Sequence, residues 1–73
     1  MIKKTKQAHR WYQIISQFKR SGNWAMVTLL ESLVYQFGIG TQYSDNITIE
    51  VDAETAYLIE DAERDANIEH GGN

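Results

Sequence analysis

The charged residues of this 73-residue chain are sorted along its length. Up to Gln36 the chain carries six cations and one anion, Glu31, for a formal charge of +5; from Phe37 onward it carries nine carboxylates and one cation, Arg64, for −8. The six cations are Lys3, Lys4, Lys6, Arg10, Lys19 and Arg20. A chain sorted in this way can fold its two halves onto each other, pair with a second copy, or steer toward a charged partner.

Length and composition limit how such a chain can be stabilised. Residues 1–73 form a single small domain, in which one hydrophobic core only just offsets the entropy lost on folding. Because the sequence has no cysteine, neither a disulfide nor a thiolate metal site adds stability. We therefore expect association with another chain, with a homodimer as the first expectation, and fraying at 1–5 and 70–73.

The sequence also predicts where the protein resides. Its basic start is similar to the first region of a signal peptide, but polar residues interrupt the next segment, and no apolar segment has membrane-spanning length. The absence of cysteine fits a cytosolic protein. We expect a soluble, cytoplasmic protein with no membrane partner.

Two helices are predicted in the first half of the chain. Over 6–20, apolar residues recur at three- and four-residue spacing, and Ser21-Gly22-Asn23 then ends one helix and caps the next. So short a link predicts an antiparallel helical hairpin. The second helix, 24–37, carries two adjacent apolar stripes, which are wider than one neighbouring helix can cover. We expect it to form the dimer interface through Trp24, Val27, Leu30, Val34 and Phe37.

The second half is predicted to hold a strand and a helix. Apolar and polar residues alternate over 47–51, which is the pattern of a half-buried strand. That strand pairs either with 39–43, in a β-hairpin, or with its copy in a second chain. Asp52 is placed to cap a third helix that runs to about Ile68. The predicted fold is α+β, in the order helix, helix, strand or β-hairpin, helix.

Catalytic chemistry has little support in the residue pattern. The chain has no cysteine, and its two histidines, His9 and His70, lie near opposite ends, so no nucleophile and base are paired by spacing. Gly38 and Gly40 lack the third glycine and the preceding strand of a phosphate-binding loop. We expect no enzyme activity, no cofactor and no metal site.

The polar face of the first predicted helix has side chains that suit phosphates and base edges. Flanked by Lys3 and Lys4, this face could lie along nucleic acid, and a DNA-binding transcriptional regulator is therefore the alternative function. The acidic half of the chain would be repelled by the same phosphates. The candidate nucleic-acid-binding residues are Lys6, Arg10, Gln13, Gln17 and Arg20.

One short segment joins an alternating strand to a capped helix: Ile47-Thr48-Ile49-Glu50-Val51-Asp52, followed by Tyr57, Leu58 and Ile59. This segment resembles the opening strand and first helix of ribbon-helix-helix repressors and antitoxins. The resemblance implies that the strands of two chains pair and that their outward residues, here Thr48 and Glu50, read the major groove. The chain departs from the family pattern because no second helix follows Asn67, and because Glu50 stands where a cation or an amide is expected.

The outer face of the third predicted helix is the strongest candidate for function. It places an aromatic and an aliphatic side chain among carboxylates, an arrangement that suits a protein contact in which the aromatic anchors and the acids select a basic partner. The candidate partner-binding residues are Glu54, Tyr57, Asp61, Arg64, Asp65 and Ile68. We expect a small protein-binding module, a regulator or inhibitor of the kind that phages and plasmids encode. An equal alternative is that Tyr57 and Ile68 meet a neighbouring subunit or the first helix, whose cations would then be that basic surface.

Overall fold

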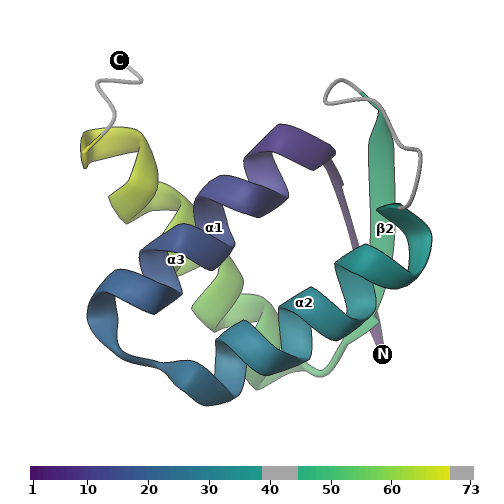
Figure 1. Cartoon of the computed structure of the whole chain (residues 1–73). Coiled ribbons are helices and arrows are strands. Elements are labelled where there is room, and N and C mark those ends of the chain that lie inside the picture. Colours follow the sequence, from purple (N-terminus) through teal and green to yellow (C-terminus); the bar gives the residue numbers. More distant parts are fainter. Residues whose placement is uncertain (39–44, 70–73) are drawn as a thin grey trace.

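The computed structural model describes residues 1–38 and 45–69 of the chain (Figure 1). The elements follow the order β1, α1, α2, β2 and α3. Their bounds are Ile2–Gln7 for β1, Ala8–Ser21 for α1, Trp24–Gly38 for α2, Asn46–Val51 for β2 and Ala53–Glu69 for α3. The mixed α+β class is confirmed, and the three helices and the second strand lie within two residues of their predicted bounds. The N-terminal strand was not predicted.

The two strands form an antiparallel sheet in which Ile2 lies opposite Val51 and Gln7 opposite Asn46. Residues 2–5, which were expected to fray, belong to β1 in the structure. The predicted hairpin mate, 39–43, lies outside the described residues, as does the predicted frayed end 70–73. Within the described chain, β2 pairs with the N-terminus of its own chain.

The sheet has one buried face and one polar face. Ile47, Ile49 and Val51 of β2 are buried, and the register places Lys6, Lys4 and Ile2 opposite them, on the same inner face. On the outer face, the Oγ1 atoms of Thr5 and Thr48 are hydrogen-bonded at 2.7 Å. Two of the three inner positions of β1 are thus occupied by lysines, which is the opposite of the apolar pattern that identifies a half-buried strand from sequence.

The helix ends are determined by the residues that the sequence indicates. Gly22 follows α1 with φ of 78°, in the left-handed region where glycine is favoured. The Asn23 Oδ1 atom accepts a hydrogen bond from the Met26 backbone N–H at 3.3 Å, at the start of α2. The Asp52 Oδ1 atom accepts one from the Thr55 backbone N–H at 2.8 Å, at the start of α3. The predicted caps are confirmed.

One hydrophobic core joins the three helices and β2 around α1. This helix packs against both α2 and α3, while β1 contacts α3 and β2 contacts α2 (Figure 1). Trp11 of α1 is fully buried, and its Nε1–H donates a hydrogen bond to the Ile47 carbonyl oxygen at 2.9 Å. The largest fully buried side chains are Trp11, Ile14, Leu30, Val34, Ile49 and Ile59.

The structure buries three of the five residues of the predicted dimer interface on α2 within one chain. Val27, Leu30 and Val34 are buried in the core of the single chain, so they offer no surface to a second copy. Trp24 is 60% exposed, and the side chain of Phe37 lies outside the described residues. The two apolar stripes of α2 predict a helix that a single chain cannot cover. In the structure, α1 and β2 of the same chain cover the buried stripe from two sides.

Candidate interaction surface on the third helix

Helix α3 has a buried face between two acidic flanks. The buried face consists of small or aliphatic residues that recur every three or four positions along the helix: Ala56, Ile59, Ala62 and Ala66. Their small size lets α3 approach α1 closely. Glu60 and Glu63 lie on the flank that borders β1 and the start of α1, and we call this the paired flank. Asp61 and Asp65 lie on the flank that borders the end of α1, and we call this the open flank. The two flanks differ in what lies opposite them.

The paired flank is neutralised by cations from the N-terminus of the same chain. The Lys6 Nζ atom lies 2.6 Å from Glu63 Oε1 and 3.1 Å from Glu60 Oε2. Lys4 Nζ lies 3.0 Å from the same Glu60 oxygen, and Arg10 Nε lies 3.3 Å from Glu63 Oε2. These contacts join the basic and acidic halves of the sequence within one chain.

Arg10 spans two acceptors on the paired flank. Besides its contact with Glu63, its guanidinium donates a hydrogen bond to Asn67 Oδ1, four residues further along α3. Residues four apart lie one above the other on a helix, so a forked guanidinium can reach both. The start of α1 is thereby attached to the second half of α3.

The contacts of Lys6 change the protonation equilibria of the flank. Burial alone would lower the pKa of Lys6, but hydrogen bonds to Glu63 and Glu60 outweigh it and raise the pKa of this ammonium above its ordinary value. Burial alone would raise the pKa of Glu60, but hydrogen bonds from Lys4 and Lys6 hold this pKa below its ordinary value. The Lys6 Nζ atom also lies 5.9 Å from the centre of the Trp11 ring, within range of a cation–π contact.

These directions predict a loss of stability in acid. The pKa of Glu60 is lowered on folding, and so is that of Asp52, through its hydrogen bonds with the side chain and backbone of Thr55. A carboxyl group with a lowered folded pKa contributes stability above its unfolded pKa, about 4, and loses it as the pH falls through the folded value. The raised pKa of Lys6 contributes stability that is fully present below about pH 10 and is lost only as the pH rises further, so it is constant over the acid range. Urea unfolding between pH 6 and 2.5 should show a falling midpoint, with a shallower fall in the Glu60→Gln variant. Equal slopes for the two proteins would contradict these assignments.

The structure leaves little of the predicted nucleic-acid-binding face available. Lys6 and Arg10 contact the paired flank, and Gln13 and Gln17 are half-buried. Gln17 Oε1 is buried and has no hydrogen-bond partner among the described residues. Arg20 is exposed. Two of the cations that sequence spacing assigns to a nucleic-acid surface therefore bind carboxylates of the same protein.

The predicted partner-binding face lies on the surface of α3. Tyr57 is 71% exposed, and Glu54 and Asp65 are also exposed. Arg64 contacts Asp61 from within the same helix, three residues away, in a solvent-exposed pair. The side chain of Ile68 lies outside the described residues. The structure thus places five of the six predicted residues on the surface of one helix. Among the described residues, no other element covers Tyr57.

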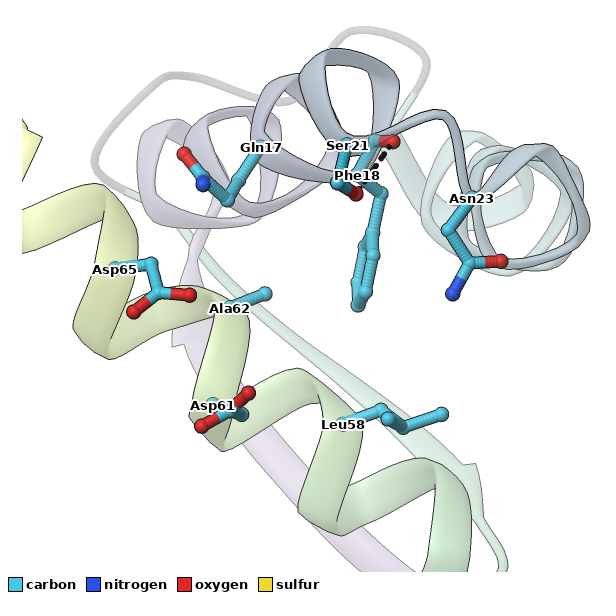
Figure 2. Close-up of a pocket in the computed structure, with 8 residues that line it drawn as sticks. All are labelled: Gln17, Phe18, Ser21, Asn23, Leu58, Asp61, Ala62 and Asp65. Atoms are coloured by element: carbon cyan, nitrogen blue, oxygen red, sulfur yellow. Dashed lines mark hydrogen bonds between the residues drawn. The ribbon is translucent and has the colours of Figure 1, made fainter.

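A hollow of about 210 Å³ lies beside the open flank (Figure 2). The ring of Phe18 points from α1 toward α3, and Ala62 points back toward it. The lining combines this apolar base with polar groups from two helices and the turn between α1 and α2: Gln17, Phe18, Ser21, Asn23, Leu58, Asp61, Ala62 and Asp65. Sequence spacing identified only Asp61 and Asp65 as partner-binding residues here, because the other residues meet them only in the folded chain.

The described residues contain no group of three or more histidine, cysteine, aspartate or glutamate side chains that could hold a metal ion. None of the helices in the described part of the chain combines the length and the apolar character needed to cross a membrane. Comparisons of the chain with models of protein families, with curated proteins and with solved structures find no match.

Proposed function

We propose that the protein is a small, non-enzymatic binding module that presents the outer face of α3 to a basic surface of another protein. Its role is that of a regulator or an inhibitor. The observation that carries the proposal is the 71% exposure of Tyr57 among carboxylates of a helix whose other flank is already neutralised. A large exposed aromatic side chain is a typical anchor of protein interfaces, and surrounding charges select the partner.

Charge pairing within the chain makes the two sides of the molecule unequal. The paired flank is occupied by Lys4, Lys6 and Arg10, so its glutamates attract an external cation only weakly. Glu54 and Asp65 take part in none of the ion pairs found among the described residues, and the Arg64–Asp61 pair is exposed and therefore weak. The negative potential of α3 is therefore directed outward, along the face that carries Tyr57.

An acidic face of this kind suggests how the module would inhibit a target. A row of carboxylates on a rigid helix imitates the charge of a phosphate backbone, so it can occupy a basic site that otherwise binds nucleic acid. The same electrostatics would accelerate association and would make binding weaker at high salt. The alternative of direct DNA binding is not favoured, because two of its candidate cations, Lys6 of β1 and Arg10 of α1, are engaged with Glu63.

The proposal predicts the loss of partner capture when the outer face of α3 is changed. The immobilised protein should retain a basic protein from an extract of its source cells, and the Tyr57→Ala, Asp61→Lys double variant should retain at least about tenfold less, since it loses both the anchor and the charge. Circular dichroism should show that the variant keeps its fold, because both side chains lie on the surface.

A matched control carries changes on the other side of the molecule. Lys3 and Thr48 lie on the outer face of the sheet, and the Lys3→Ala, Thr48→Ala double variant should retain the partner as the unchanged protein does. Capture that persists in the Tyr57, Asp61 variant would contradict the proposal. So would capture that disappears after nuclease treatment, because the partner would then be nucleic acid.

A further inference from the structure

The hollow beside the open flank repeats the arrangement by which the chain binds its own cations. On the paired flank, an aromatic side chain of α1, Trp11, lies near two carboxylates of α3, and Lys6 fills the space between them. Phe18 follows Trp11 by seven residues, two turns further along the same face of α1. It lines the same hollow as a second pair of carboxylates of α3, Asp61 and Asp65 (Figure 2).

We propose that this hollow, defined by Phe18, Leu58, Asp61 and Asp65, binds an arginine side chain of the partner protein. The inference rests on the proposed function and names the group that α3 recognises. The base of the hollow is apolar, through Phe18, Leu58 and Ala62, and suits the aliphatic stem of the side chain. Its rim carries the two carboxylates that receive the charged head.

Size and spacing favour a single arginine side chain. At about 210 Å³, the hollow is smaller than the sites that take drug-sized ligands. Asp61 and Asp65 are four residues apart, the spacing of the two α3 residues, Glu63 and Asn67, that Arg10 already spans. A planar guanidinium offers five donors in a fixed fork, whereas a lysine ammonium is a point charge that satisfies one carboxylate at a time.

The residues around the rim leave the carboxylates available. Among the described residues, Asp65 takes part in no ion pair, and Asp61 is paired only with Arg64 of its own helix. That pair is exposed on both sides, with side chains 68% and 40% accessible, so exchange for an incoming guanidinium costs little. Bringing the partner's arginine to Asp61 and Asp65 also places the partner's backbone beside Tyr57, on the same outer face of the helix.

Nuclear magnetic resonance titration of the full chain with short peptides tests the proposal. The probes are a neutral-ended peptide with one central arginine and the same peptide with citrulline, which has the same shape and no charge. We expect the arginine peptide to bind at millimolar concentration, with shifts centred on Phe18, Leu58 and Asp65. The citrulline peptide should bind at least about tenfold more weakly, since it lacks the charge-assisted hydrogen bonds. A peptide with lysine should fall between them.

Two variants separate the hollow from general attraction by the negative charge of the protein. Asp65→Asn removes one charge from the rim and should weaken arginine binding by about tenfold. Glu50→Gln removes the same charge from β2, outside the hollow and outside the proposed binding face, and should change binding by less than about twofold, because exposed charges interact weakly over distance. Both side chains are exposed, so neither change should lower the thermal midpoint by more than a few degrees.

The outcomes that overturn the proposal are distinct from those that overturn the function. Absence of binding at millimolar peptide, equal binding of arginine and citrulline, lysine binding as tight as arginine, or equal effects of Asp65→Asn and Glu50→Gln would each refute the arginine site. If partner capture still depended on Tyr57 and Asp61, the binding face would stand without this anchor. If the peptide bound in the hollow but no basic protein were captured, the site would stand and the proposed partner would be wrong.

Discussion

Replacement of Trp11 with alanine should unfold a large fraction of the protein at room temperature. The side chain is fully buried, and it joins α1 to β2 through its hydrogen bond to the Ile47 carbonyl oxygen. Removing a buried tryptophan costs about 3–5 kcal/mol, and a small domain has a total stability near the lower end of about 5–15 kcal/mol. Circular dichroism and urea titration would measure the loss.

The second tryptophan of the chain provides a matched control. Trp24 stands at the start of α2 and is 60% exposed, so Trp24→Ala removes the same atoms from a largely solvated position. We expect a loss of less than about 1 kcal/mol, as is usual for surface substitutions. If the two alanine variants lost similar amounts of stability, the assignment of Trp11 to the centre of the core would be wrong.

Charge reversal at Lys6 should have the second largest effect. Its side chain is 12% accessible and contacts both Glu60 and Glu63, so Lys6→Glu would crowd three carboxylates together on the inner side of the sheet. We expect a loss of about 2–3 kcal/mol, because the change removes the cation of a partly buried network and adds a like charge. Urea unfolding at neutral pH would measure it, and acid should reduce the difference as the carboxylates are protonated.

Lys3 tests whether position or only net charge matters. It lies on the same strand but on the outer face of the sheet, opposite Glu50, and its side chain is exposed. Lys3→Glu makes the same change in net charge and places like charges directly across the strands, which costs about 0.2–1 kcal/mol. An equal loss for the Lys3 and Lys6 variants would show that net charge, and not the contact with α3, determines stability.

The sequence was sufficient for the elements whose stability is local. The spacing of Trp11, Ile14, Ile15 and Phe18 identified α1, and the alternation over 47–51 identified β2, because each pattern reflects burial of one face. The caps Asn23 and Asp52 were identifiable because their side chains bond to backbone groups three residues away. These features depend on residues that are close in the chain.

Strand β1 could not be predicted because its inner face is basic. A half-buried strand is recognised by apolar residues at alternate positions, but positions 4 and 6 are lysines. They are tolerated there because their stems lie along the core while Nζ reaches acidic side chains of α3, Glu60 for both and Glu63 for Lys6, which are more than fifty residues away in the sequence. The lysines can occupy the inner face of β1 only because of this contact with α3, and a contact so distant in the sequence leaves no local pattern that would reveal the strand.

The candidate site was predictable in part. Helical spacing placed Tyr57, Asp61 and Asp65 toward the outside of α3, where the structure has them. The hollow was not predicted, because Phe18, Ser21 and Asn23 approach α3 only when α1 packs across it. The interface assigned to α2 includes Val27, Leu30 and Val34, which the structure buries within one chain, because apolar width alone does not show how many elements of the same chain will cover it.

The central claim is that the sorted charges of this chain pair within one molecule, through Lys6 and Glu63. Unfolding free energies of Lys6→Met, Glu63→Gln and the double variant would measure the coupling between the two side chains. The account predicts that the double variant loses less stability than the two single losses combined, by about 1 kcal/mol or more, as is usual for contacting groups. Losses that simply add would contradict it, because the two side chains would then have no interaction in the folded protein.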